Sequence, residues 1–356
     1  MSDPVRAELL ARIGNTGDVA ALRGLRDQIQ AHMGPLLFER PIEQFYTDLN
    51  EVHDALIRRA VALSEEKLAR MGEGSPPVPY AYLLFGSGGR EEQTLTSDQD
   101  SGLVYADPED PSQLEEVARY FGLFAQTVVM TLQQLGYPPC EGEVVSSNPL
   151  WCQSLSQWTG KLDLWFKEPD WERVRYLLIV ADCRIVAGQP FVWLALKEHF
   201  FMLMLSTDRI AESMLNNTMR HKVLLGVFGQ LFKEHYGEDA GSLDLKYGAY
   251  IPMVNAIRLL AIQAGIRATA TMTRIEDLTR HGVLDEAEGA AYAEVFRLFM
   301  RLRLLTTSKL EDGFYTSGGK LSNARLTKEL IEELKAGLRI VRKLQKKVRK
   351  RATGRI

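Results

Sequence analysis

Apolar residues recur at helical spacing through the first 70 residues of the chain. Leu22, Leu25 and Ile29 are three and four positions apart. A longer apolar stripe extends from Ile42 to Met71 and predicts a second, longer helix. The segment Gly72–Pro79, rich in glycine and proline, stops any helix. The pattern therefore predicts a helical N-terminal region that ends in a linker.

The hydrophobic period changes after this linker. Tyr80–Phe85 is a continuous apolar run followed by a glycine, which is typical of a buried strand, and Gly102–Tyr105 predicts a second strand. A helix is predicted for residues 113–135 and a third strand for residues 143–145. These elements predict a small mixed sheet with helical cover.

Almost everything beyond residue 153 has helical periodicity. The predicted helices are 153–166, 170–187, 190–205, 208–235, 243–265, 273–280, 285–308 and 325–350. The fold class predicted from these patterns is α+β, with a small mixed-sheet core, a helical N-terminal region and a C-terminal helical bundle. We assign residues 1–75 to the N-terminal region, 76–200 to the core and 201–356 to a C-terminal helical domain.

Composition is that of a globular protein. Of 356 residues, 46% are hydrophobic and 25% are charged, which excludes a disordered or fibrous chain. The longest apolar run, Phe200–Leu205, is far shorter than the roughly 18 residues that span a bilayer, and the N-terminus has no signal-peptide pattern. Three cysteines without a C-x-x-C pair imply neither a disulfide framework nor a zinc ribbon. We expect a soluble, cytoplasmic protein without membrane contact.

The net charge of -3 is a cancellation between two parts of the chain. Residues Arg339–Ile356 contain nine basic side chains and no acidic one, which leaves -12 on the rest. An acidic body disfavours nucleic acid as a partner. If nucleic acid binds at all, the basic C-terminal helix is the place to expect it.

The segment Gly86–Asp100 carries the candidate chemistry, between two predicted strands. It begins with Gly86-Ser87-Gly88-Gly89, and a glycine-rich turn after a buried strand lets backbone amides approach a phosphate closely. Asp98 and Asp100 are two residues apart, so in an extended segment their carboxylates point to the same side. Such a pair favours a divalent cation, and Mg²⁺ in particular. Taken singly, each half has an ordinary alternative: a tight turn, or an aspartate-capped turn.

The two halves together are much more specific. Gly-Ser, ten residues and Asp-x-Asp, with Arg90 and Glu92 between them, resemble the nucleotidyltransferase superfamily of DNA polymerase β. The sequence is most similar to bacterial signal-transduction nucleotidyltransferases, which have a core like that of PII uridylyltransferases and a helical substrate-binding domain. Members are often joined to CBS or cyclic-nucleotide-binding modules. The resemblance also includes Cys140–Trp151 and Asp182-Cys183-Arg184.

This resemblance implies a role for each residue of the motif. Gly86 and Ser87 would hold the phosphates of a nucleoside triphosphate, and Arg90 would neutralise triphosphate charge. Asp98 and Asp100 would hold two Mg²⁺ ions and so form the catalytic centre.

Two roles in this motif have alternatives. The superfamily usually supplies a third metal-binding carboxylate from a later strand, and Glu143 is the first candidate because it opens the predicted strand at 143–145. Glu141 and Asp163 are the alternatives. Arg90 could instead form an ion pair with one of the two glutamates that follow it.

The activity implied by the resemblance is Mg²⁺-dependent transfer of a nucleoside monophosphate, from ATP or UTP, to a hydroxyl of a protein, with release of pyrophosphate. The expected acceptor is a regulatory protein, as in PII uridylyltransferases. A nucleotide-binding regulatory module with little or no catalysis is one alternative. Transfer to RNA or to a small molecule is another. The sequence does not specify the base, the acceptor or the oligomeric state.

Overall fold

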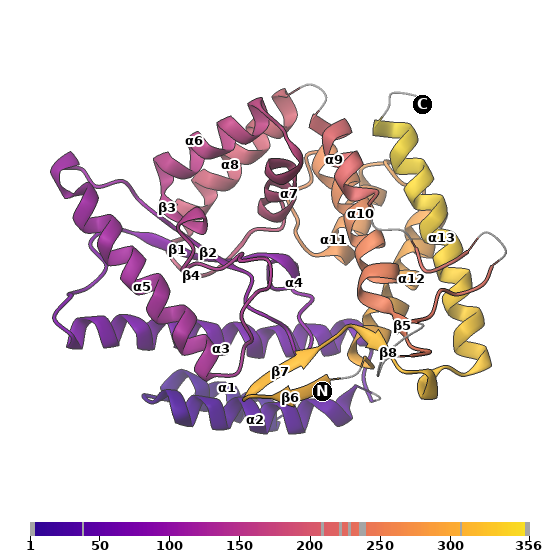
Figure 1. Cartoon of the computed structure of the whole chain (residues 1–356), viewed down its shortest axis with the longest axis horizontal. Coiled ribbons are helices and arrows are strands. Elements are labelled where there is room, and N and C mark those ends of the chain that lie inside the picture. The colour runs from indigo at the N-terminus through magenta and orange to yellow at the C-terminus, as the bar shows by residue number, and fades with distance from the viewer. Residues whose placement is uncertain are drawn as a thin grey trace. The chain divides into compact units, whose positions relative to one another are not determined.

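The computed structural model describes residues 4–37, 39–207, 210–220, 223–226, 229–234, 240–306 and 308–352. The chain forms two compact units (Figure 1). Unit 1 comprises Met1–Leu162, Asp182–Phe200 and Leu310–Thr316, and unit 2 comprises Asp163–Ala181, Phe201–Lys309 and Ser317–Ile356. Helices predominate and the main sheet is small and mixed, which confirms the predicted α+β fold.

Unit 1 begins with three helices that pack against one another. They are α1 (Pro4–Asn15), α2 (Val19–Leu36) and α3 (Ile42–Arg70). A fourth helix, α5 (Leu114–Gln134), packs against α3, and its apolar side is buried as the sequence predicts. Because α3 contacts one edge strand of the sheet and α5 contacts the other, this helix pair extends across the sheet (Figure 1).

The central sheet of unit 1 has four strands in the order β3-β2-β1-β4. They are β1 (Tyr80–Leu84), β2 (Ser101–Tyr105), β3 (Cys152–Ser154) and β4 (Arg184–Gly188). β1 is antiparallel to both β2 and β4, and β2 is parallel to β3. Every residue of β1 and β2 is buried, as their continuous apolar sequences predict.

Two predictions about the sheet were wrong. Residues 143–145 form no strand, and the strand beside β2 is β3 instead. The helix predicted for 170–187 ends at Val180, as α7 (Trp171–Val180), and β4 follows it. Both strands are three to five residues long, and their identity depends on pairing with distant residues, which helical periodicity does not reveal.

Two helices have residues in both units: α6 (Leu155–Lys167) and α8 (Pro190–Ser206). The other helices of unit 2 are α9 (Ile210–Thr218), α10 (Ile251–Gln263), α11 (Thr271–Arg280), α12 (Glu286–Leu304) and α13 (Lys328–Ala352). α10 is central, since it contacts α9, α11 and α13 and is buried from Pro252 to Ile262. A π-helical turn, Lys246–Tyr250, leads into it.

The helix predicted for 208–235 was also too long. α9 ends at Thr218, and among the described residues that follow Leu225 and Leu231 form an isolated bridge. Further short elements interrupt the helical pattern of unit 2. β5 (Leu243–Asp244) pairs with β8 (Lys320–Leu321), and a 3₁₀ turn occupies Asn323–Arg325. Unit 1 has two 3₁₀ turns among its described residues, Pro111–Gln113 and Pro149–Trp151.

A hairpin, β6 (Ser308–Glu311) and β7 (Phe314–Ser317), returns the chain to unit 1. The Tyr315 amide donates a hydrogen bond to the carbonyl of Gly136, at 3.2 Å, and its hydroxyl donates to Asp27 Oδ1 at 2.6 Å. Arg23 Nη1 donates to the carbonyl of Gly313 at 2.8 Å. The hairpin is therefore an integral part of unit 1, although more than 100 residues separate it from the rest of that unit.

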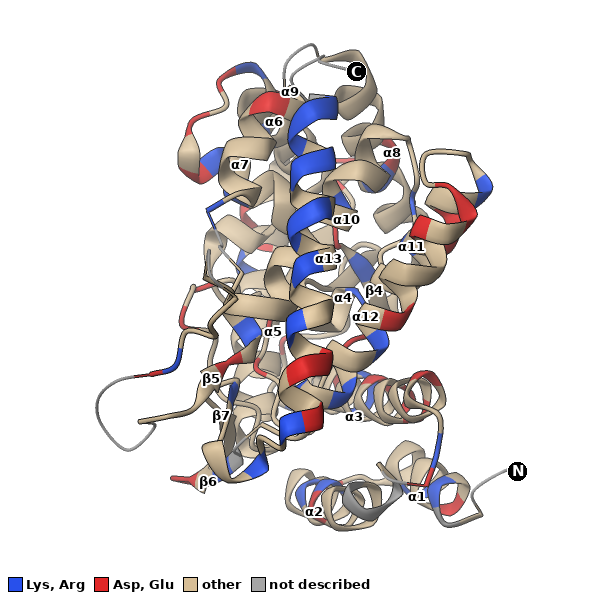
Figure 2. Ribbon diagram, turned by 90° about the vertical axis from the view of Figure 1, so that its right-hand side faces the viewer, with Lys and Arg blue, Asp and Glu red and all other residues tan. Residues whose placement is uncertain are grey.

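The last helix, α13, is amphipathic. Leu334, Leu338, Val341 and Leu344 are fully buried, while Arg339, Lys343, Lys346 and Lys350 are exposed. Figure 2 shows these basic residues as a blue row along the helix. Among the described residues, no helix combines the length and the apolar character that crossing a bilayer requires.

Candidate functional site

The glycine-rich turn and the two aspartates meet at one end of the sheet. The turn, α4 (Gly86–Gly89), directly follows β1, and Asp98 and Asp100 directly precede β2. β1 and β2 are antiparallel, with Leu84 opposite Ser101, so the end of one strand lies beside the start of the other. The Phe85 amide donates to the Asp100 carbonyl at 2.9 Å, which extends this pairing by one step.

Two glycines of the turn are required by close contacts. Gly86 has a φ of +52°, and a Cβ there would lie 2.0 Å from Asp100 Oδ2. A Cβ on Gly89 would lie 1.9 Å from the carbonyl oxygen of Asp182. The carboxylate of Asp100 thus packs directly on the turn, and no side chain fits between them.

The two aspartates present their carboxylates together. Oxygens of Asp98 and Asp100 and the sulfur of Cys140 lie within 4.8 Å of one another, and all three residues are half-buried. Gln99, between the aspartates, is buried and points elsewhere: its Nε2 donates to the carbonyl of Tyr137 at 3.2 Å. Two carboxylates on one side fit a divalent cation such as Mg²⁺.

Cys140 is a residue that sequence reasoning did not assign to the site. Burial, and then the charge of Asp100, raise the pKa of its thiol to about 12. Sulfur suits softer cations better than Mg²⁺, so the donor set is two hard ligands and one soft neighbour. Forty residues separate Cys140 from Asp100 and no spacing motif links them, so only the fold reveals the contact.

No third carboxylate joins this group among the described residues. Glu143 is exposed, with a φ of +55°, and its amide closes a turn to the Cys140 carbonyl at 3.1 Å. Glu141 is exposed in the same turn, and Asp163 belongs to unit 2. The strand expected to present Glu143 is absent, and the role of Glu143 as a metal ligand stays a prediction.

Arg90 follows the turn and is only 3% exposed. Its Nε lies 2.8 Å from Glu92 Oε2 and its Nη1 lies 2.6 Å from Asp182 Oδ2. The ion-pair alternative is therefore present, with Glu92 rather than Glu91 as the near partner and Asp182 as a second one. Ser87 is half-buried, and its carbonyl accepts a hydrogen bond from the Glu92 amide at 2.8 Å. Phosphate binding by Arg90 and Ser87 stays a prediction.

A second ion pair supports the turn from α3. Arg184 Nη1 and Nη2 donate to the two carboxylate oxygens of Asp54, at 2.7 and 2.9 Å. Nη2 also donates to the Gly88 carbonyl at 2.8 Å. Asp54 is 6% exposed, so this charge is buried and paired. A single aspartate within an amphipathic helix gives no sequence signal of such a contact.

The loop between the turn and the aspartates is tied to α3 by His53. Its Nε2 donates to the Thr94 carbonyl at 3.0 Å, and the Tyr137 hydroxyl donates to its Nδ1 at 2.7 Å. Burial, together with the charge of Arg26, lowers the pKa of His53 to about 3. The imidazole is therefore neutral, as these two hydrogen bonds require.

Comparison with known families supports the predicted resemblance. Residues 31–172 match a family model described as "Putative nucleotidyltransferase DUF294". Residues 208–352 match a second one, "Putative nucleotidyltransferase substrate binding domain". The chain belongs to this nucleotidyltransferase family. The first match contains the turn, both aspartates and Cys140, and the second contains α9 to α13. No curated protein matches this nucleotidyltransferase in sequence.

Proposed function

We propose that this nucleotidyltransferase moves a nucleoside monophosphate from a nucleoside triphosphate to a hydroxyl group of a protein, with Mg²⁺ held by Asp98 and Asp100. The observation that carries this proposal is the contact between the Asp100 carboxylate and Gly86. It joins a turn suited to phosphate and a carboxylate pair suited to a divalent cation at one end of the sheet.

Each group of the site has a task in this proposal. The first amides of the turn lack carbonyl partners within it and bind the triphosphate, together with the hydroxyl of Ser87. Asp98 and Asp100 hold Mg²⁺, which when bound neutralises the triphosphate and the charge that develops on the attacking and leaving oxygens. The ion pairs of Arg90 with Glu92 and Asp182 fix the end of the turn.

The transfer needs little else from the protein. The acceptor oxygen forms a bond to the α-phosphorus while the bond to the departing pyrophosphate breaks. The proton of the acceptor hydroxyl passes to a carboxylate oxygen of Asp98 or Asp100 that does not hold Mg²⁺. The substrate-binding family match over residues 208–352 supports unit 2 as the source of acceptor contacts.

A protein acceptor is favoured by two features. The chain resembles PII uridylyltransferases, and its body without the basic tail has a net charge of -12. An acidic surface repels the phosphates of a nucleic acid. Because the chain resembles uridylyltransferases, UTP is the first donor to test and ATP the second.

The test is incubation with α-labelled UTP or ATP, Mg²⁺ and a cell lysate. The variant Asp98→Asn with Asp100→Asn is expected to lose label transfer by about 10³-fold or more, because the cation site is lost. The matched control is Glu115→Gln with Glu116→Gln, which removes two exposed carboxylates at the start of α5. If the aspartate variant still labels its acceptor, the assigned cation site is wrong.

A second function, nucleotide binding with little or no transfer, is favoured by one observation. In the described residues the neighbour of the aspartate pair is the thiol of Cys140 and not a third carboxylate. Calorimetry with UTP and ATP, with and without Mg²⁺, measures binding. Pyrophosphate release in the presence of lysate then separates an enzyme from a sensor: binding without release would favour the sensor.

A further inference from the structure

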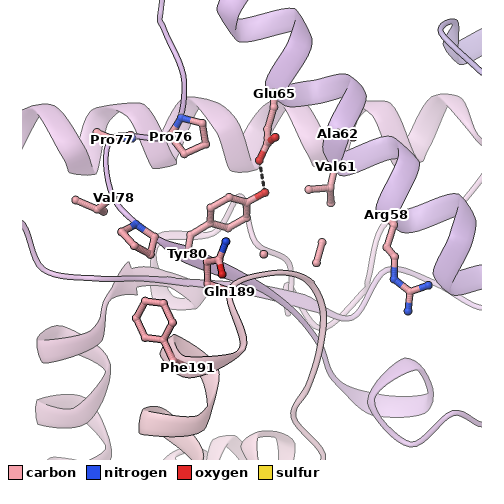
Figure 3. Close-up of a pocket in the computed structure, with 13 residues that line it drawn as sticks. Arg58, Val61, Ala62, Glu65, Pro76, Pro77, Val78, Tyr80, Gln189 and Phe191 are labelled. Atoms are coloured by element: carbon pink, nitrogen blue, oxygen red, sulfur yellow. Dashed lines mark hydrogen bonds between the residues drawn. The ribbon is translucent and has the colours of Figure 1, made fainter. Parts of the chain in front are cut away.

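A cavity of about 680 Å³ lies at the opposite end of β1 from the glycine turn. One face of α3 forms one wall, through Arg58, Val61, Ala62 and Glu65 (Figure 3). The proline-rich linker before β1, the end of β4 and the start of α8 form the rest. Its volume is within the range of small-molecule sites, and all of it lies in unit 1.

Apolar and polar groups contribute about equally to the surface of the cavity. Val61 and Ala62 face the linker residues Pro76 and Val78 across the cavity, and Phe191 closes one side while remaining 58% exposed (Figure 3). Prolines have few conformations to lose when a ligand binds. The cavity therefore offers preformed apolar contacts to a ligand of suitable size.

The polar groups of the cavity select the charge of that ligand. Arg58 Nε donates to the Val186 carbonyl at 2.9 Å and Nη2 contacts Asp54 at 3.3 Å, while Nη1 has no partner among the described residues. Glu65 already accepts a hydrogen bond from the Tyr80 hydroxyl. It lies seven residues from Arg58, about 10 Å along the helix. An anionic group is thus attracted to the Arg58 end and repelled from the other.

Arg58 is also the first member of a chain of contacts that reaches the glycine turn. It contacts Asp54, Asp54 is bound by both terminal nitrogens of Arg184, and Arg184 donates to the Gly88 carbonyl. A ligand anion that draws Arg58 away from Asp54 alters the balance of charge on Asp54. This changes the interaction of Asp54 with Arg184, whose Nη2 donates to the Gly88 carbonyl of the turn.

We propose that this cavity is an effector site for a small apolar anion, a carboxylate or a phosphate monoester on a ring or hydrocarbon, and that its occupancy is transmitted to the glycine turn through Asp54 and Arg184. The second half of this statement rests on the proposed function, since it treats the turn as the substrate-binding segment. The first half does not.

Binding is tested with 2-naphthoate and its neutral counterpart 2-naphthamide, by ligand-observed NMR titration. We expect naphthoate to bind at least about tenfold more tightly, which corresponds to one charge-assisted hydrogen bond. Arg58→Gln is expected to remove this difference. Ala62→Trp places an indole on the α3 wall, in the space that the ligand would occupy, and is expected to abolish binding, whereas Ala69→Trp, on an exposed part of α3 outside the cavity, leaves it intact.

Transmission is tested by hydrogen exchange of residues 86–92 at saturating naphthoate. The exchange rates of these amides are expected to change in the wild type and to stay unchanged in Arg184→Gln. This variant should still bind naphthoate, and that binding serves as the control that it is folded. Equal affinity for naphthoate and naphthamide, or binding retained in Ala62→Trp, would overturn the site. Unchanged exchange in the wild type would overturn the coupling. Neither readout involves nucleotide transfer, so both are independent of the labelling experiment.

Discussion

The two units of this nucleotidyltransferase are stabilised by different interactions. Unit 1 buries charged and polar groups around the glycine turn, and these groups bind one another: Arg90 with Glu92 and Asp182, and Arg184 with Asp54. Unit 2 is organised around α10, which is buried along most of its length and contacts α9, α11 and α13. Two buried arginines also lie in this unit: Arg258 donates to Asn255, and Arg274 donates to the carbonyls of Ala268 and Ala181. Exposed ion pairs such as Arg301–Glu333, at 3.6 Å, contribute little there.

The difference follows from the backbone. A helix satisfies its own amides and carbonyls, so the backbone of α10 needs few partners from other elements. Beyond the single turn of α4, residues 91–100 have no such regular pairing, and carbonyls of this segment and of the turn's end are bound by side chains from elsewhere in the unit. Arg184 binds the carbonyl of Gly88, and His53 binds that of Thr94. Irregular backbone at the candidate site is thus supported by side chains from α3 and β4.

The largest effect expected from this comparison is at a glycine. Gly89→Ala places a Cβ 1.9 Å from a backbone oxygen, so the turn or residue 182 must move, and we expect a loss of about 4 kcal/mol or more in the free energy of unfolding. Gly122→Ala, in open space on α5, should instead stabilise by about 0.5–1 kcal/mol. Urea unfolding followed by circular dichroism compares the two. A loss below about 1 kcal/mol for Gly89→Ala would contradict the close contact.

An intermediate effect is expected when one ion pair of each unit is broken. Arg184→Gln leaves the partly exposed Arg58 as the remaining ion-pair partner of the buried Asp54 carboxylate within the described part of the chain, and we expect a loss of about 3 kcal/mol. Arg301→Gln, in the exposed pair of unit 2, should change stability by less than about 0.5 kcal/mol. Thermal and urea unfolding measure both. Similar losses for both variants would remove the distinction between the units.

The smallest effect expected is a pH dependence from His53. Its pKa is about 3 in the folded protein and 6.5 in the unfolded chain, so between these values only the unfolded chain takes up a proton. The free energy of unfolding should therefore fall as the pH is lowered, by up to about 1.4 kcal/mol per unit between pH 6 and pH 4. His53→Gln is expected to flatten this slope, and the exposed His281→Gln to leave it unchanged. Urea titrations at several pH values provide the measurement.

Much of the fold could be predicted because its elements are long or strongly patterned. The apolar stripe of α3, the buried runs of β1 and β2 and the stripe of α13 each identify their element from local sequence alone. The neighbouring positions of the glycine turn and the aspartates follow from antiparallel pairing of consecutive strands. β3 and β4 were not predicted, because both are short and are defined by pairing with strands that are distant in the sequence.

The supporting contacts of the site could not be predicted for a different reason. Asp54 and Arg184 are 130 residues apart, and Cys140 meets Asp100 from a loop after α5. Neither pair has a spacing that a local pattern records. Side chains that carry chemistry through a motif are visible in the sequence, whereas side chains that hold the motif in place become visible only when the chain is folded.

The hairpin β6–β7 has a consequence for how this protein is made. Tyr315 and Gly313 supply contacts to Asp27, Arg23 and Gly136, so unit 1 includes residues that a ribosome adds only after more than 100 residues of unit 2. The sheet and the first helices leave the ribosome long before the hairpin β6–β7 is synthesised. The contacts between this hairpin and the rest of unit 1 can therefore form only after most of unit 2 has been synthesised. Folding of unit 1 is thus completed no earlier than the synthesis of most of unit 2.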